Sequence, residues 1–363
     1  MNKITRSSLI LLAFGIFCAP VAAAESSCPF VGCWALTIPG GGAGWLGVTE
    51  QVDARGRPYL DAGILWGGGS VVPVSSVFAD DDTLYITRIR NVDRGAKDIV
   101  RSVKMDGSFV RENFKTEQPS GRTQQFVELI TAQISGDTLY LKQFNTPEFL
   151  GRQIRESDFV GKRIPPLPPK PDLSKVKFGE PIQLFNGQNL DGWKLTNSRQ
   201  TSGWSVRDGI LTNNPAQKPG QPHISYGNLQ TEREFEDFNL KVEVMVPPGG
   251  NSGIYLRGIY EVQVADTFGR PLDPHNMGAV YSRISPRVNA EKPANEWQTV
   301  DITLCDRHVT VILNGVVIID NEPLMGCTGG AMWSDEFRPG PIYLQGDHTG
   351  VSYRSVVLTP IEK

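Results

Sequence analysis

The chain has 363 residues, of which 39% are hydrophobic and 21% charged, as in ordinary folded globular proteins. Lys and Arg number 36 against 39 Asp and Glu, so the formal charge of −3 lacks the positive excess with which proteins bind nucleic-acid phosphates. At this length two domains are expected rather than one. The 38 glycines and 26 prolines make the chain rich in turns, which favours mostly β structure.

Residues 1–24 have the pattern of an export signal. Lys3 and Arg6 supply a positive start, an apolar stretch covers residues 9–17, and three alanines at 22–24 form a small-residue cleavage site. We therefore expect the mature protein to be exported, to the periplasm or outside the cell. No other segment approaches the 18 apolar residues of a transmembrane helix, so no membrane span is predicted.

Four cysteines follow the signal: Cys28, Cys33, Cys305 and Cys327. An even number of cysteines in an oxidising compartment favours disulfides. The economical pairing joins Cys28 to Cys33 and Cys305 to Cys327, which keeps each bond within one domain. Four free, buried thiols are the alternative, because the sequence does not fix the distance between two Cα atoms.

The N-terminal domain is expected at residues 25–163. Short alternating segments such as 82–90 and 138–142 are separated by turn clusters, which predicts a small antiparallel β-barrel or sandwich. The Gly-x-Trp sequence at 32–34 resembles the start of lipocalin-like barrels. A proline-rich segment then runs from Ile164 to Pro171 and favours an extended backbone, so residues 164–177 are predicted to be a linker.

The C-terminal domain, expected at residues 178–363, has the same β rhythm in a stronger form. Residues 238–246 alternate between apolar and polar side chains. Residues 308–313 and 316–320 flank Asn314 and Gly315, a pair that accepts the positive φ angles of a tight hairpin turn. These patterns predict a curved β-sandwich.

The segment 251–266 holds the most informative polar residues. The period of two residues in a strand places Tyr255 and Arg257 on one face, and Glu261 and Gln263 on one face after the break at Gly258. If the two rows share a face, they combine a cation, a carboxylate, an amide and an aromatic ring, a mixture suited to binding sugars. A solvated face with an ordinary Arg–Glu pair is the alternative.

A second polar cluster lies at 340–350, where a predicted strand ends in a loop. Tyr343 and Gln345 share a face of the strand, and Asp347 and His348 follow in irregular backbone, where functional residues concentrate. His348 is a candidate proton carrier, and a turn histidine with a structural hydrogen bond is the alternative.

Two long loops are expected to wall a pocket. The connection 267–295 is unusually long for a compact domain, and such loops are usually functional. The loop 325–337 contains Trp333, which would offer a stacking surface to a sugar if exposed and would otherwise belong to the core. The polar residues of the first loop include Asp273, His275, Tyr281, Arg283, Arg287 and Lys292.

Motifs of several enzyme classes are absent from the sequence. It has no zinc-protease helix motif and no nucleophile elbow, and the glycines at 40–42 and 67–69 precede no helical pattern, so hydride-transfer cofactors are not expected. No cofactor is assigned. A divalent cation is an open alternative, since carboxylates and imidazoles are cation ligands. The candidate ligands are Glu261, Asp266, His275 and His348.

Four segments in this order resemble the 3-keto-disaccharide hydrolase domain family: 184–193, 251–266, 295–297 and 344–348. The resemblance runs from about Gly179 to Ile361. It implies a concanavalin-like jelly-roll sandwich in an exported bacterial protein, with a small carbohydrate substrate already oxidised to a ketone at carbon 3. Thr349-Gly350 departs from the Gly-Pro that similar proteins often have.

The implied chemistry is an elimination followed by hydration. A ketone at carbon 3 acidifies the hydrogen on carbon 2, so that a base can remove it, the aglycone leaves carbon 1, and water adds. We expect Glu261 or His348 as the base, Arg257 or a bound cation at the enolate oxygen, and Asp266 or His275 as the acid. The expected sugar-binding residues are Tyr255, Gln263, Tyr281, Lys292, Trp333, Gln345 and Asp347. A carbohydrate-binding protein without catalysis is the alternative, since fold does not fix function.

Overall fold

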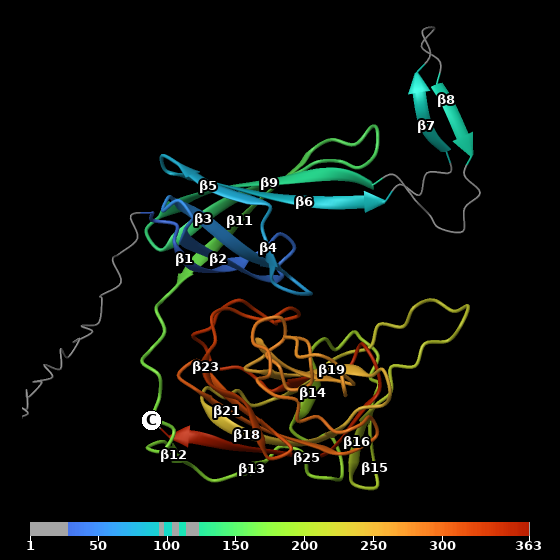
Figure 1. Cartoon of the computed structure of the whole chain (residues 1–363). Helices are drawn as coiled ribbons and strands as arrows, with labels where there is room; N and C mark the ends of the chain where they lie inside the picture. Colours follow the sequence, from blue (N-terminus) through green and yellow to red (C-terminus); the bar gives the residue numbers. More distant parts are fainter. Residues whose placement is uncertain (1–27, 94–97, 104–108, 114–122, 363) are drawn as a thin grey trace, which may run out of the picture.

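A computed structural model describes residues 28–93, 98–103, 109–113 and 123–362, and the expected signal at 1–24 lies outside these ranges. Every regular element of the described residues is a β-strand, which confirms the all-β prediction. Among these residues no helix has the length and hydropathy needed to cross a bilayer. The strands form one body before residue 164 and a second after residue 177 (Figure 1).

The N-terminal body is one antiparallel sheet in the order β4-β3-β2-β1-β11-β10-β9-β6-β5. The segment after β4 curls the sheet on itself, because Val74 N donates to Ala62 O and Ser75 N to Thr87 O, on opposite parts of the sheet. The enclosed core contains Trp34 and other buried apolar side chains. The strands are β1 (Gly32–Thr37), β2 (Ala43–Val52), β3 (Pro58–Trp66), β4 (Val72–Pro73), β5 (Ser76–Asp80), β6 (Thr83–Asp93), β9 (Thr123–Ser135), β10 (Thr138–Asn145) and β11 (Arg155–Ile164), with β7 (Asp98–Val103) and β8 (Phe109–Asn113) as a separate pair.

The C-terminal body is a jelly-roll sandwich of two antiparallel sheets, as predicted. The larger sheet runs β15-β16-β25-β18-β21-β22-β23 with β12 and β13 also paired to β25, and the smaller runs β14-β17-β24-β19-β20. Its strands are β12 (Lys177–Phe178), β13 (Ile182–Gln183), β14 (Trp193–Leu195), β15 (Trp204–Arg207), β16 (Ile210–Asn213), β17 (Leu229–Thr231), β18 (Phe238–Met245), β19 (Asn251–Leu256), β20 (Tyr260–Ala265), β21 (Gln298–Cys305), β22 (His308–Leu313), β23 (Val316–Pro323), β24 (Tyr343–Leu344) and β25 (Val351–Glu362).

The alternation of side chains decides which faces meet in the sandwich. In β18, Leu240, Val242 and Val244 point into the core while the residues between them are less buried. Ile254 of β19 and Val262 of β20 enter the same core from the smaller sheet. The other face of β19 and β20, which carries the predicted polar residues, therefore points away from the sandwich core.

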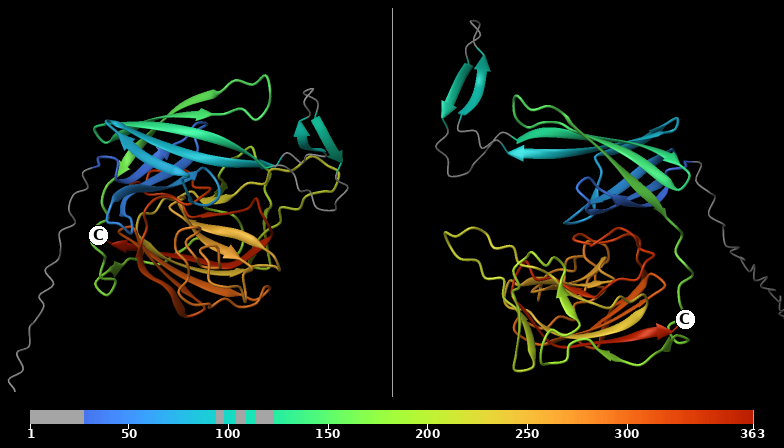
Figure 2. Two further views of the ribbon diagram at one scale, coloured as in Figure 1. Left: turned by 45° about the horizontal axis from the view of Figure 1, so that its top comes forward. Right: turned by 180° about the vertical axis from the view of Figure 1, so that it is seen from behind.

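The chain between the two bodies contains no strand, since β11 ends at Ile164 and β12 begins at Lys177. Figure 2 shows this segment passing along one side of the molecule. Arg307 Nη2 donates to Pro165 O at 3.1 Å and to Pro166 O at 2.9 Å, and Asn321 donates to Pro171 O at 2.8 Å. The proline-rich segment is thus bound to the C-terminal sandwich at both ends.

The N-terminal body contacts the face of the sandwich that carries the polar residues. Gly330 N donates to Gly67 O at 3.1 Å, and Val71 N donates to Ser282 Oγ at 2.9 Å. The Arg283 guanidinium lies 4.5 Å from the centre of the Trp45 ring. The loop between β3 and β4 therefore closes over this part of the C-terminal domain.

The cysteine pairing is a correction. Among the described residues no disulfide joins any two of the four cysteines. Cys305 ends β21 beside Asp306, whereas Cys327 lies in a loop with its sulfur 3.9 Å from Gly44 O of the N-terminal domain, so the two occupy different surroundings. Cys33 projects from β1, and its side chain interacts with Trp45. The short sequence separations within the two predicted pairs therefore did not indicate which cysteine side chains approach each other.

Candidate functional site

Three neighbouring strands bring the predicted polar residues to one face. Tyr255 of β19 lies opposite Glu261 of β20 and opposite Tyr343 of β24. Gly253 lies opposite Gln263. Because directly paired residues in a sheet point to the same side, these side chains form one polar face on the smaller sheet.

Glu261 is the most perturbed acid of this face. It is only 4% exposed, and burial raises its pKa from 4.5 to about 8. A hydrogen bond from Tyr255 and the charge of His348 act against this rise in pKa. A carboxyl with such a pKa gains and loses a proton near neutral pH, as a general acid or base must.

The Tyr255 hydroxyl sets the proton arrangement around Glu261. It lies 2.9 Å from Glu261 Oε2 and 2.7 Å from Gly329 O, yet a phenol has one proton to donate. When Glu261 is ionised, Tyr255 can donate to it. When Glu261 is protonated, the carboxyl can donate to the Tyr255 oxygen while Tyr255 donates to Gly329 O. The network thus satisfies both charge states of Glu261.

Tyr343 holds Tyr255 in place. The two rings are stacked with centroids 3.9 Å apart and an angle of 10° between their planes. Tyr343 donates to Gly330 O at 3.1 Å, next to the carbonyl that Tyr255 reaches. Both tyrosines therefore depend on the backbone at 329–330, which the N-terminal loop contacts through Gly67.

Two amides of this face have a free acceptor. The Oε1 atoms of Gln263 and Gln345 are buried without a hydrogen-bond partner. A buried amide oxygen without a partner is costly, so such atoms often mark the position of a ligand. Hydroxyl groups of a sugar would supply the missing donors.

His348 and Asp347 border the face in the loop after β24. Their Nδ1 and Oδ1 atoms are 2.7 Å apart, and both side chains are nearly half exposed. The hydrogen bond that His348 donates to Asp347 raises the pKa of His348 and lowers the pKa of Asp347. Thr349 fixes the loop, because its Oγ1 accepts from Asn251 N at 2.6 Å and donates to Asn251 O at 2.8 Å. The departure Thr349-Gly350 thus has a structural role.

The long loop adds Tyr281 and His275 to the border. Val262 pairs with Val280, so Tyr281 lies opposite Glu261 and Tyr281 N donates to Glu261 O at 3.0 Å. The His275 ring is edge-on to Tyr281, with centroids 5.0 Å apart. Its Nε2 lies 2.9 Å from Ser70 Oγ, and its Nδ1 bonds Asp273. The first domain thus contributes Ser70 to the surroundings of the site.

Arg257 corrects the sequence prediction. The strand pairing ends at Leu256 and Tyr260, so Arg257 sits in the hairpin turn with φ of 54° rather than in the alternating row. Its guanidinium donates to the backbone oxygens of Glu336 and Arg338. The expected placement of Arg257 beside Glu261 is therefore wrong.

Asp266 is likewise separate from Glu261. Five residues of extended strand span roughly 16 Å, and the odd spacing turns the side chain to the opposite face. Asp266 Oδ2 accepts from Gly249 N at 2.8 Å, which closes the turn before β19. Asp266 thus holds the backbone and does not join the proton network.

Lys292 and Trp333 also lie outside the group. Lys292 Nζ donates to Trp297 O at 3.1 Å. Trp333 packs against the sandwich core, and the Arg338 guanidinium covers its ring at 4.0 Å. The alternative of a core tryptophan therefore fits Trp333 better than an open stacking surface.

The four predicted cation ligands do not form a cluster. In the described part of the chain the one group of three acidic or thiol ligand atoms lying within 4.8 Å of one another is Asp237, Cys305 and Asp306. It excludes Glu261 and His348. Asp237 there accepts from Asp306 N at 3.1 Å.

Two contributors to the site, Gly253 and Ser70, were missed from the sequence. Gly253 leaves room for the acid, because a Cβ there would lie 2.2 Å from Glu261 Oε1. Ser70 belongs to the other domain. The close packing of Gly253 has no signature in a single sequence, and the approach of Ser70 follows from domain docking alone.

Comparisons with known proteins match the C-terminal half of the chain. Residues 180–359 match the model of the 3-keto-alpha-glucoside-1,2-lyase-like domain. A curated relative, the 3-keto-disaccharide hydrolase of Bacteroides thetaiotaomicron, is 28% identical over an alignment of 148 positions, and the match covers 33% of this chain. The match spans about half, 51%, of that relative.

Two solved structures of Parabacteroides distasonis proteins assigned as glycosyl hydrolases are also similar. The first is 29% identical with a TM-score of 0.41, covering 54% of this chain and 93% of that chain. The second is 20% identical with a TM-score of 0.40, covering 50% and 94%. On the family match, the C-terminal domain of this chain belongs to the 3-keto-alpha-glucoside-1,2-lyase-like domain family.

Proposed function

We propose that the protein is an exported enzyme that cleaves 3-keto-glycosides by elimination and hydration. The observation that carries the proposal is Glu261, a buried carboxyl whose pKa is raised to about 8 and whose two charge states are both satisfied by the Tyr255 network. A group that accepts a proton and later returns it needs this property. The family membership of the domain supports the substrate class.

In the proposed reaction, Glu261 takes the proton from carbon 2 of the keto sugar. The C–H electrons first form an enolate, with its negative charge on the oxygen at carbon 3. When these electrons form the carbon 1–carbon 2 double bond, the bond from carbon 1 to the aglycone oxygen breaks, and that oxygen takes up a proton. Water then adds its hydroxyl to carbon 1 and a proton to carbon 2. The net change is hydrolysis of the glycosidic bond.

His348 takes the place that Arg257 leaves vacant in this scheme. Its pKa is raised by the hydrogen bond that it donates to Asp347, and its charge acts on Glu261. As an imidazolium it would stabilise the negative oxygen that develops at carbon 3. His275, beside Tyr281, is the candidate for giving a proton to the leaving oxygen.

The two amides would hold the substrate. Gln263 and Gln345 each have an unpartnered buried oxygen on the face of Glu261 and can accept hydrogen bonds from sugar hydroxyls. The same observation favours the second candidate function, carbohydrate binding without turnover, because amides beside aromatic rings are sufficient for binding.

Release of nitrophenol from a 4-nitrophenyl 3-ketoglucoside tests the proposal. The E261Q variant is expected to lose roughly 10²–10⁴ in kcat, the usual contribution of a general acid or base. Glu243→Gln is the matched control, since Glu243 pairs with Arg354 on the other sheet. Deuterium at carbon 2 is expected to slow the reaction.

Equal turnover of the unoxidised glycoside, or no isotope effect together with an active E261Q variant, would remove the elimination mechanism. Sugar binding without any turnover of the keto sugar would instead establish the non-catalytic function.

A further inference from the structure

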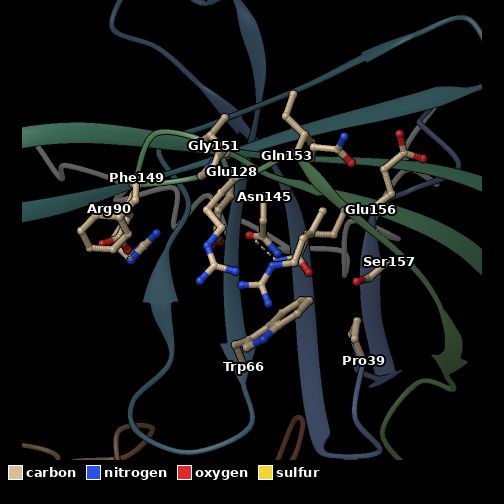
Figure 3. Close-up of a pocket in the computed structure, with 17 residues that line it drawn as sticks. Pro39, Trp66, Arg90, Glu128, Asn145, Phe149, Gly151, Gln153, Glu156 and Ser157 are labelled. Atoms are coloured by element: carbon tan, nitrogen blue, oxygen red, sulfur yellow. Dashed lines mark hydrogen bonds and ion pairs between the residues drawn. The ribbon is translucent and has the colours of Figure 1, made fainter.

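The N-terminal domain has its own cavity, which the proposed reaction does not use. Its volume is about 1350 Å³, and it lies at the end of the sheet beneath the connection between β10 and β11. Figure 3 shows Trp66 and Pro39 on one side, Gly151 and Gln153 on the opposite side, and Asn145 between them. This volume exceeds the usual 300–1,000 Å³ of small-molecule pockets, so it can hold more than one ring.

The carboxylates that line the cavity are all paired with cations. Glu128 lies 3.1 Å from Arg88, Glu148 forms an ion pair with Arg90, and Glu156 lies 3.6 Å from Lys142. Lys142 also lies 3.6 Å from Asp158, so Glu156 shares its cation with a second carboxylate.

Two lining guanidiniums have no such partner. Among the described residues, neither Arg152 nor Arg155 forms an ion pair or a side-chain hydrogen bond. Together with the partners Arg88, Lys142 and Asp158, the lining has five cations and four carboxylates, an excess of one positive charge. A guanidinium binds a carboxylate through two parallel hydrogen bonds, so this excess favours an organic anion.

Apolar and amide groups complete the lining. Phe149 is 66% exposed and Ile154 58% exposed, although both border the cavity. Trp66 is fixed by edge-on packing against Phe159 at 5.3 Å. Gln143 is 4% exposed and donates to Asn145 Oδ1 at 3.3 Å. Such surfaces favour a ligand that has an apolar ring face as well as its charge.

We propose that this cavity binds an organic carboxylate with an apolar ring face, distinct from the sugar cleaved at Glu261. A uronic-acid oligosaccharide and an aromatic carboxylic acid share this chemistry. The cavity lies next to the C-terminal domain. Trp66 lines the cavity, and the following residue, Gly67, accepts a hydrogen bond from Gly330 N of that domain. A chain held in the cavity would therefore be kept on the enzyme.

Calorimetric titration of the full-length protein tests this site. Trigalacturonate and 4-hydroxybenzoate are the two anionic probes, maltotriose is the neutral probe, and sodium sulfate is the plain anion. We expect binding of one or both carboxylates and not of maltotriose. The probe that binds more tightly shows whether the carboxylate belongs to a uronic-acid oligosaccharide or to an aromatic acid.

Variants locate the binding. Arg152→Ala and Arg155→Ala are each expected to weaken it by about tenfold or more, as loss of a charge-assisted hydrogen bond does. Phe149→Ala, a change of an exposed side chain, is expected to weaken it as well. Arg55→Ala is the matched control, because Arg55 is exposed in the same domain and does not line the cavity.

Three results would overturn the site: neither carboxylate binds, maltotriose or sulfate binds as tightly as the carboxylates, or both arginine variants keep full affinity. Turnover of the small keto-glycoside is expected to be unchanged in these variants, so the cavity and the proposed reaction are tested separately.

Discussion

The Tyr255→Phe variant tests the proton network most directly. It removes the hydroxyl 2.9 Å from Glu261 Oε2 while keeping the ring stacked on Tyr343. A hydrogen bond to a charged group contributes about 1.5–3 kcal/mol, and one pKa unit corresponds to about 1.4 kcal/mol. Since Tyr255 lowers the pKa of Glu261, its loss is expected to raise that pKa by about one to two units.

The assay is the pH profile of kcat/KM on the keto-glycoside. A base acts when ionised, so the rate rises with pH through the pKa of Glu261. Tyr255→Phe is expected to move this rising limb to higher pH. Tyr260→Phe is the matched control. Tyr260 is on the same strand but the opposite face and donates to Glu336 at 2.7 Å. A limb that stays in place in Tyr255→Phe, or moves equally in Tyr260→Phe, would refute the reasoning.

Two further predictions concern Glu261. Its pKa is raised from 4.5 to about 8 by burial, so the folded state holds a proton that the unfolded state releases, and stability falls as pH rises across that window by at most about 5 kcal/mol. The E261Q variant is expected to lose this slope in urea unfolding between pH 5 and pH 8, and an unchanged slope would contradict it. In Gly253→Ala the new Cβ would lie 2.2 Å from Glu261 Oε1, so kcat is expected to fall at least tenfold, and full activity would argue that the carboxyl position is unimportant.

The polar face could be predicted because strand alternation is local. Tyr255, Glu261 and Gln263 follow the period of two residues, and the structure keeps them together. The prediction for Arg257 was wrong because the hairpin turn begins directly after Leu256. The alternation of side chains does not continue beyond the end of a strand, and strand ends are the least reliable part of a sequence prediction. The sequence also could not predict that Ser70, 205 residues away in the chain, lies 2.9 Å from His275, because that contact depends on domain docking.

We infer that the docked N-terminal domain contributes to the burial that raises the pKa of Glu261. The outer face of a sandwich sheet is normally wet, yet Glu261 is 4% exposed. Its backbone bonds Thr328 and Tyr281, and the N-terminal domain contacts the neighbouring Gly330 and Ser282. Gly329 is at this contact: a Cβ there would lie 2.0 Å from Gly69 O. Gly329→Ala should therefore push the two domains apart.

Water admitted by that separation would remove part of the desolvation that raises the pKa of Glu261. The rising limb of the rate profile is expected to move to lower pH in Gly329→Ala, opposite to its movement in Tyr255→Phe. Gly68→Ala is the control. Gly68 is next to Gly69 in the N-terminal loop, and a Cβ at Gly68 would meet nothing within 4 Å. If Gly329→Ala keeps the profile of the unaltered protein while Gly68→Ala does too, the N-terminal domain does not govern the acid, and its covering of the site has another purpose.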